Sequence, residues 1–333
     1  MDMAYLGKLR YVDPLYDILL SQVCPGLREP VFHVNKMDSF EVYKYTEEKT
    51  GVAVIGKFFK LNDPEQERIL RKRTEYENLQ KIRAYGFDSF PNYVVRPISR
   101  DEKIGLALLE EFIDGQDLDH YLKKAIFQGN GNLLKKKLSK LASFLYALHK
   151  RTETETGVDL ESMNAYFQKL LKKLSRQAVI SDLDRKEYLR LMDQWLNQTL
   201  LQEAKEVIVH GDATPTNFLF SDTDSVAAID LERMKNADAV FDLGIVCGEI
   251  KHAFLWRSGN GYEAEPFIRY FFESYSSHYD DRKKAFKKIT ARNPFYMAMA
   301  ELRIARNNYL DFHYRKRLAF EALQCLEWGL RLK

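Results

Sequence analysis

The sequence predicts an α+β fold in which a strand-rich N-terminal third precedes a longer, mainly helical region. Two segments of the first third, Val52–Phe59 and Gly105–Phe112, are rich in strand-forming residues. A further strand-rich stretch, residues 207–229, consists of apolar runs separated by a polar loop and a Ser/Asp/Thr turn. The segments that follow residue 242 carry apolar residues at helical spacing.

The composition is that of a globular protein. The chain has 333 residues, of which 45% are hydrophobic and 30% are charged, and this length suggests two or three structural units. Three widely spaced cysteines, Cys24, Cys247 and Cys325, argue against a disulfide framework and favour a cytoplasmic setting. No apolar run reaches about 18 residues, so no membrane span is expected. The net charge of +3 is too small to indicate nucleic-acid binding.

The first strand-rich segment presents one lysine on a defined face. Alternation along a strand places Ala53, Ile55, Lys57 and Phe59 on the same side. Lys60 is the competing cation, but it falls on the opposite side and at the end of the strand. We therefore expect Lys57 to be the functional lysine and Ile55 to share its face.

The next element is expected to be a helix over residues 64–85. Glu75 lies four residues before Leu79 and seven before Ile82, so it belongs to the inward apolar stripe. Glu77 fits better on the outward surface. The pattern therefore favours Glu75 as the acidic partner of a buried strand lysine, against the alternative of an ordinary, partly exposed helix residue.

The most informative segment is the loop His210–Asn217, which lies between apolar runs. Together with the turn that follows, it delivers Asp212, Asn217 and Asp230 to one region. Phosphoryl transfer from a nucleotide needs such a set, because one carboxylate orients and deprotonates a hydroxyl while an amide oxygen and a second carboxylate hold Mg²⁺. The alternative is an ordinary hairpin in which Asp and Asn serve as turn formers.

The spacing in this loop carries a family resemblance. Asp212 and Asn217 have the spacing of the kinase catalytic loop H-R-D-x-x-x-x-N, and Ile229–Glu232 stands where kinases carry D-F-G. The H-G-D and I-D-x-E motifs resemble the small-molecule phosphotransferase branch of the protein-kinase-like superfamily, which includes aminoglycoside phosphotransferases and choline kinase. The segment Val52–Lys57 is similar to the kinase V-A-I-K strand.

The resemblance implies a two-lobed, protein-kinase-like fold. Residues 1–109 would form a small N-lobe with an antiparallel sheet and one helix. Residues 110–116 would form a hinge, and residues 117–333 a mainly helical C-lobe with the catalytic loop and the acceptor pocket.

The resemblance also implies roles for individual residues. Asp212 would act on the acceptor hydroxyl, and Asn217 and Asp230 would bind Mg²⁺. Lys57, held by Glu75, would neutralise the phosphates of ATP, with GTP as the alternative donor.

Further residues are expected to bind the nucleotide. Ile55 would pack against the adenine, and Ser39 would contact the phosphates from a turn over residues 35–40 that contains no glycine. The stretch before Gly115 resembles the family's M-E-Y-x-x-G motif, whose backbone reads the adenine edge. Three consecutive residues are the candidates for this backbone recognition: Glu111, Phe112 and Ile113.

The acceptor is expected to be a small molecule. The eleven residues 231–241 are too few for a protein-kinase activation segment, and no A-P-E motif follows. Residues 261–333 contain 14 Lys/Arg against 9 Asp/Glu, which favours a neutral or anionic hydroxyl compound. The alternatives are a nucleotide-binding pseudokinase that acts as an interaction module, an aminoglycoside kinase and a protein kinase. Glu232 has two alternative assignments: it lies near the metal without binding it directly, or it is a solvated turn residue.

Overall fold

The computed structural model describes residues 4–39, 41–59, 66–221 and 225–331. The chain divides into two compact units. The first unit consists of Met1–Gly115 and Ser221–Arg233, and the second of Gln116–Phe220 and Met234–Lys333. Lys60 and the first residues of the expected helix over 64–85 lie outside the described residues.

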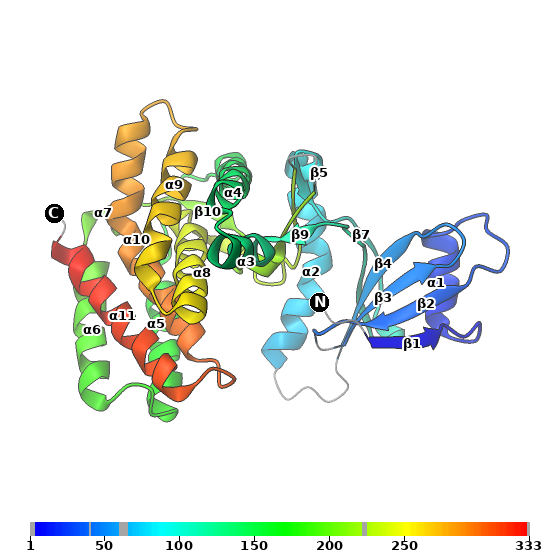
Figure 1. Cartoon of the computed structure of the whole chain (residues 1–333), viewed down its shortest axis with the longest axis horizontal. Coiled ribbons are helices and arrows are strands. Elements are labelled where there is room, and N and C mark those ends of the chain that lie inside the picture. Colours follow the sequence, from blue (N-terminus) through cyan, green and yellow to red (C-terminus); the bar gives the residue numbers. More distant parts are fainter. Residues whose placement is uncertain (1–3, 40, 60–65, 222–224, 332–333) are drawn as a thin grey trace. The chain divides into compact units, whose positions relative to one another are not determined.

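The first unit is built on a six-stranded sheet whose neighbouring strands are all antiparallel (Figure 1). This confirms the antiparallel N-terminal sheet that the sequence predicts. In spatial order the strands are β1 (Ala4–Lys8), β2 (Phe32–Lys36), β3 (Val42–Glu47), β4 (Ala53–Phe58), β8 (Leu106–Glu111) and β7 (Pro97–Asp101). A short helical turn, η2 (Glu102–Ile104), links the last two.

One face of this sheet is covered by a helix that the sequence analysis missed. Helix α1 (Pro14–Gln22) begins at Asp13, whose side chain accepts a hydrogen bond from the N–H of Leu15 at 3.0 Å. Its apolar residues pack with Phe32 and Val54 in a buried core. The expectation of a single N-terminal helix is therefore wrong, although the Asp-Pro start signal is present in the sequence.

The second helix of this unit is α2 (Gln66–Ile82), which continues into a π-helical turn, η1 (Arg83–Phe87). The turn contains Gly86 at φ 85°, a left-handed conformation that glycine adopts without strain. Beyond it, the short strands β5 (Asp88–Ser89) and β6 (Asn92–Val94) form a hairpin.

The segment Ser221–Arg233 belongs to the first unit, although the sequence analysis assigned it to the C-terminal lobe. Its strand β12 (Val226–Ala228) pairs in parallel with β6. The side chain of Asn78 in α2 also donates a hydrogen bond to the carbonyl of Leu231 at 2.9 Å. These long-range contacts, and not its position in the sequence, attach the segment to the first unit.

The second unit is mainly helical. Its helices are α3 (Leu118–Gln128), α4 (Gly131–Arg151), α5 (Leu160–Arg176), α6 (Asp182–Leu196), α7 (Thr199–Gln202), α8 (Val240–Ser258), α9 (Glu265–Ser276), α10 (Arg282–Ala305) and α11 (Phe312–Arg331), with the short turns η3 (Pro215–Asn217) and η4 (Gly261–Ala264). Two small antiparallel pairs complete it. Strand β10 (Glu206–Val209) pairs with β13 (Lys235–Asp238), and β9 (Gln116–Asp117) pairs with β11 (Phe218–Phe220).

Helix α10 passes a proline, a residue type that usually starts or kinks a helix. The structure has one helix with Pro294 in its interior. A methyl group on Gly329 of α11 would collide with the Pro294 ring, so the two helices approach closely there. This packing favours the continuous helix despite the hydrogen bond that proline cannot donate.

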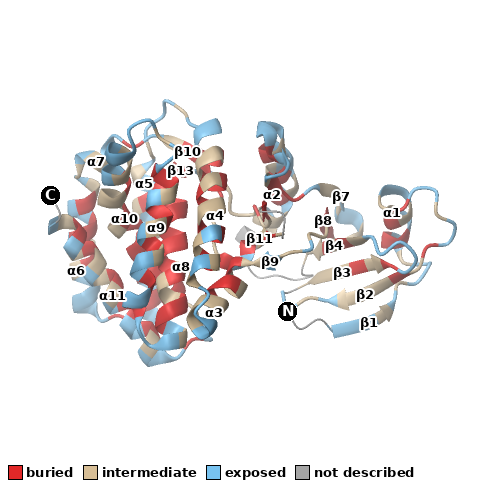
Figure 2. Cartoon of the chain, turned by 45° about the horizontal axis from the view of Figure 1, so that its top comes forward, coloured by how far each residue is buried: buried red, intermediate tan, exposed pale blue. Residues whose placement is uncertain are grey.

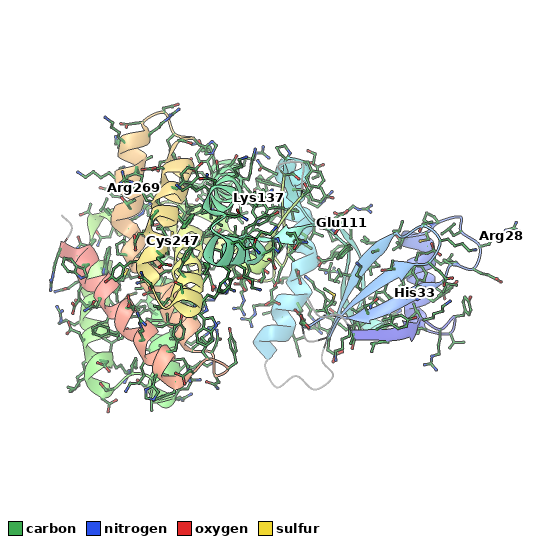
Figure 3. All side chains as sticks on the ribbon, viewed as in Figure 1. Arg28, His33, Glu111, Lys137, Cys247 and Arg269 are labelled. Carbon is green, nitrogen blue, oxygen red and sulfur yellow. The ribbon has the colours of Figure 1, made fainter. Side chains whose placement is uncertain are left out.

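Helix α8 is largely buried, and every residue from Val240 to Gly248 is buried (Figure 2). Cys247 lies near its middle (Figure 3). Close contact with α10 depends on two small residues, because a methyl group on Gly244 would collide with Tyr296 and one on Gly248 with Ala300. Over the described ranges, no helix is long and apolar enough to cross a membrane.

Candidate active site

The first unit contains the lysine and the helix glutamate that the sequence pattern pairs. Nζ of Lys57 in β4 lies 2.6 Å from Oε1 of Glu75 in α2, and their side chains are only 13% and 2% exposed. Glu75 lies on the same buried stripe as Leu79 and Ile82. Ile55 is partly buried and two residues before Lys57, so it shares the lysine's face of the strand.

A second carboxylate, missed by the sequence analysis, also contacts this lysine. Oε1 of Glu110 in β8 lies 3.1 Å from Nζ of Lys57. Ile55 of β4 is paired with Glu110, so Glu110 lies diagonally across from Lys57 on the same face. The sequence indicates Glu110 only weakly, because this residue stands in an apolar strand segment. The register of that strand against β4 cannot be predicted from local sequence.

The buried cluster carries more negative than positive charge. Burial alone would lower the pKa of Lys57, but Glu110, Glu75 and Asp230 together raise this pKa well above its usual value. Burial raises the pKa of Glu75 to about 8, and Asp230 and Glu110 add to this while Lys57 opposes it. Burial likewise raises the pKa of Glu110. One ammonium group thus faces three carboxyl groups, an arrangement that additional positive charge would relieve.

Asp230 and Glu232 follow strand β12 in this unit and approach Glu75. One carboxylate oxygen of each of these three residues lies within 4.8 Å of the others. Asp230 has a left-handed backbone with φ 62°, which is uncommon for a residue other than glycine and costs some backbone strain. Hard oxygen ligands and surplus negative charge are what a magnesium ion requires, so these residues fit such an ion.

The segment expected to read the adenine lies at the end of β8, where Figure 3 labels Glu111. The N–H of Glu111 donates to the carbonyl of Arg96, and the N–H of Phe112 donates to the carbonyl of Ala53, both at 3.1 Å. These two donors are therefore engaged within the protein. Any backbone recognition would rely on carbonyl oxygens of this segment or on Ile113.

The turn expected to cover the phosphates is shorter than the sequence suggested. Asn35 and Lys36 belong to strand β2 and pair with β3, which leaves residues 37–41 as the connection. Ser39 is exposed in this connection, while Phe40 lies outside the described residues. Glu41 adopts a left-handed backbone with φ 54°, which shows that the turn reaches this conformation without glycine.

The second unit contains the loop His210–Asn217, which begins at the end of β10. Gly211 takes φ 78°, a left-handed conformation that suits glycine. The buried carboxylate of Asp242, in the first turn of α8, accepts hydrogen bonds from the N–H groups of His210 at 2.7 Å and Gly211 at 3.0 Å. Asp242 therefore braces the loop.

A buried histidine completes this brace. Nε2 of His149 lies 3.2 Å from Oδ2 of Asp242, and Nδ1 lies 2.9 Å from the Tyr275 hydroxyl. Burial raises the pKa of Asp242, but its bonds to His149, and the charges of His149 and His210, outweigh burial, so the pKa is lowered overall. The carboxylate is thus held in its charged form.

Asp212 and Asn217 lie next to each other in this loop. Nδ2 of Asn217 donates to the carbonyl of Asp212 at 2.9 Å, and Asn217 is buried. This bond uses the amide nitrogen, and the amide oxygen is the atom that a metal ion would take.

The carboxylate of Asp212 is ion-paired with Arg303, which the sequence analysis did not single out. Arg303 belongs to α10, and 91 positions separate the two residues in the sequence. No local motif signals such a contact. Sequence reasoning could have found Arg303 only as one of many cations in the basic C-terminal region.

An antiparallel sheet with a lysine–glutamate pair, and a braced H-G-D loop, define a phosphotransferase of the protein-kinase-like class. The model of the phosphotransferase enzyme family matches residues 38–284, more than half of this chain. The chain belongs to this family and is therefore a kinase that phosphorylates small molecules. No curated protein matches it.

Solved structures share the fold. A choline kinase from Cryptosporidium parvum superimposes with a TM-score of 0.57 at 13% identity, covering 95% of this chain and 93% of that chain. An ethanolamine kinase from Plasmodium vivax gives 0.56 at 13% identity, with 90% and 78% covered. The APH(2'')-IIa enzyme, solved with streptomycin and ATP, gives 0.56 at 12% identity, with 95% and 97% covered. At such identities the likeness concerns the fold alone.

Proposed function

We propose that this kinase transfers the γ-phosphoryl group of ATP to a hydroxyl group of a small, neutral or anionic molecule. The observation that carries the proposal is the buried pair of Lys57 and Glu75, 2.6 Å apart. A buried lysine that is already oriented can neutralise donor phosphates without further reorganisation. A chain that had lost nucleotide chemistry would have no need to keep this charge buried.

The family and its structural neighbours support a purine nucleotide as the donor. APH(2'')-IIa was solved with ATP, and an aminoglycoside 2'-phosphotransferase was solved with GDP. Because GDP is the product that GTP would leave, ATP and GTP are the two candidate donors for this chain, and ATP is the one we propose. Ile55 would contact the purine, and the end of β8 from Glu111 to Ile113 would bind its edge through the backbone. Ser39 would contact the phosphates.

Mg²⁺ is the proposed metal, held by Asp230 and Asn217. When bound, it would neutralise charge on the donor phosphates. The surplus carboxylates around Lys57 fit this role, because Asp230 acts electrostatically on Lys57, Glu75 and Glu110. Glu232 has a cation of its own, Arg233, at 3.6 Å, so we assign it an outer position.

Asp212 is the proposed group that orients the acceptor hydroxyl and accepts its proton. Phosphoryl transfer depends mostly on positioning and charge stabilisation, so a well-held carboxylate is sufficient. Asn217 holds the carbonyl of Asp212, and Asp242 holds the two residues before it, His210 and Gly211.

The charges near Asp212 bear on the acceptor. Arg303 places a cation at the carboxylate. The acidic neighbour Glu249 is only partly ionised at neutral pH, because burial raises its pKa to about 7 despite the opposing charge of Arg303. These surroundings offer little to attract a polycation, and they support a neutral or anionic acceptor.

A two-stage assay tests the proposal. Thermal shift with ATP·Mg²⁺ measures nucleotide binding, and ADP release is then followed with sugars, amino alcohols, nucleosides, hydroxy acids and aminoglycosides. If ATP·Mg²⁺ binds but none of the compounds causes ADP release, the chain would instead be a pseudokinase that acts as an interaction module. The glycine-free turn near Ser39 would be compatible with that alternative. A kcat/KM for kanamycin-like compounds above about 10⁴ M⁻¹s⁻¹, the lower end for efficient enzymes, would overturn the proposed acceptor class.

A further inference from the structure

The guanidinium of Arg303 contacts two consecutive residues of the catalytic loop. Nη2 binds Oδ1 of Asp212, and Nη1 donates to the carbonyl of Gly211 at 3.3 Å. Both charged side chains are largely buried, with 12% of Arg303 and 16% of Asp212 exposed. We propose that Arg303 is a positioning residue, which fixes the Asp212 carboxylate in the orientation that meets the acceptor hydroxyl. This inference rests on the function proposed above for Asp212.

The fold makes this contact through the close crossing of two helices. A methyl group on Gly248 of α8 would collide with Cβ of Ala300 in α10, so the two backbones nearly touch. Arg303 lies one helical turn beyond Ala300 and therefore on the same side of α10. Asp242 lies in the first turn of α8 and braces the loop, so this pair of helices supplies both Asp242 and Arg303.

The loop backbone has anchors other than Arg303. The N–H groups of His210 and Gly211 bind Asp242, and the carbonyl of Asp212 accepts from Asn217. These bonds leave the orientation of the Asp212 side chain unspecified, and Arg303 contacts that side chain directly. Loss of Arg303 should therefore disturb the carboxylate while the loop and the fold persist.

The chemistry explains why an arginine suits this position. Its planar guanidinium presents N–H groups in a fixed fork, so it can bind the carboxylate and the neighbouring carbonyl together. A lysine ammonium lacks this fixed geometry. Phosphoryl transfer depends mainly on orientation and charge stabilisation, so a cation beside the carboxylate is compatible with its role.

Other charged groups surround this pair without replacing it. Burial would lower the pKa of Arg303, but Asp212, Tyr166 of α5 and Glu249 of α8 raise it overall. Lys235 of β13 also acts on Arg303 electrostatically. Glu249 is the one further carboxylate among these groups. If Arg303 acted mainly by neutralising Glu249, Glu249→Gln would lower kcat as much as loss of Arg303.

The test compares Arg303→Met and Arg303→Lys with Arg292→Met as the matched control. Arg292 lies on the same helix, is similarly buried at 16% exposure, and pairs with the buried Asp238 at 3.0 Å. The assay measures ADP release from ATP·Mg²⁺ with water as the acceptor, together with the KM for ATP. We expect Arg303→Met to lower kcat by about 100-fold, as misplacement of a reacting group does.

The KM for ATP should change little, since Arg303 is not assigned to the nucleotide. Arg303→Lys should recover part of the lost kcat, and Arg292→Met and Glu249→Gln should retain most of theirs. Added guanidinium should partly restore kcat in Arg303→Ala and leave Arg292→Ala unchanged. Such rescue is a result that a purely structural role would not produce.

Three outcomes would overturn the inference. One is a kcat for Arg303→Met close to that of the folded wild type. Another is an equal loss in Arg292→Met and Arg303→Met, which would indicate a general effect of burying an unpaired charge. Absence of any ADP release by the wild type, with water or with the acceptor panel, would overturn the proposed function as well. If the wild type releases ADP and Arg303→Met has the same kcat, this inference is overturned but the proposed function is not.

Discussion

Nζ of Lys57 lies 3.1 Å from Oε1 of Glu110, a carboxylate supplied by the neighbouring strand and nearly inaccessible to solvent. The lysine also contacts Glu75, from a helix, at 2.6 Å. It is therefore held from two directions, while Asp230 adds a third negative charge. The carboxylates repel one another and are all attracted to Lys57. Substituting the lysine and substituting a carboxylate should therefore affect the stability of the protein differently.

Lys57→Met should destabilise the protein, and Glu110→Gln should not. Removing the lysine leaves several buried carboxylates without their cation, and breaking such a pair costs about 3–5 kcal/mol. Glu110→Gln removes one of the repelling charges and keeps the bond between Lys57 and Glu75. We expect its free energy of unfolding to stay within about 1 kcal/mol of the wild type or to rise. Urea unfolding of both variants measures this, and a larger loss in Glu110→Gln than in Lys57→Met would contradict the explanation.

Asp212→Asn should retain the fold and nucleotide binding but lower turnover by about 100-fold or more, the usual contribution of a positioned acid–base group. The loop backbone is held by Asp242 and Asn217, whose bonds do not involve the Asp212 carboxylate. ADP release and thermal shift with ATP·Mg²⁺ measure the two properties separately. Turnover near the wild-type level would remove Asp212 from the proposed role.

Asp230→Ala should weaken Mg²⁺-dependent nucleotide binding far more than Glu232→Ala. Both carboxylates lie near Glu75, but Glu232 is also close to Arg233, at 3.6 Å. That cation partly neutralises it, so Asp230 is the better ligand. Magnesium titrations at fixed ATP concentration compare the variants, and the reverse order would exchange the two assignments.

Glu301→Gln should remove part of the pH dependence of stability. Burial raises the pKa of Glu301 from 4.5 to about 7, although Lys251, at 2.9 Å, opposes this. The folded state then holds the proton more tightly than the unfolded state. The resulting stabilisation is complete below about pH 4.5 and is lost as the pH rises through 7, by up to about 3 kcal/mol.

Urea unfolding at pH 5 and pH 8 measures this effect as the difference between the wild type and Glu301→Gln. The matched control is Glu321→Gln, because Glu321 pairs with the same lysine at 2.9 Å but is 28% exposed. The control should keep the wild-type dependence on pH. A wild-type stability that falls no more steeply than that of Glu301→Gln would contradict the linkage.

Local sequence patterns were sufficient for several parts of the candidate site. Strand alternation placed Lys57 and Ile55 on one face, and the helical stripe selected Glu75 over Glu77 as the lysine's partner. The spacing within the loop identified Asp212 and Asn217 as neighbours. These features could be predicted because each depends on the period of one strand or helix or on a short loop.

Other features were decided by contacts between segments far apart in the chain. Glu110 meets Lys57 through the register of two strands, and Arg303 reaches Asp212 from α10, which packs closely against α8 at Gly248. Helix α10 likewise continues through Pro294, whose ring packs against Gly329 of α11. Strand register and helix crossing depend on how side chains fill a shared core. A local pattern therefore specifies which residues face inward, and only the folded chain specifies which of them meet.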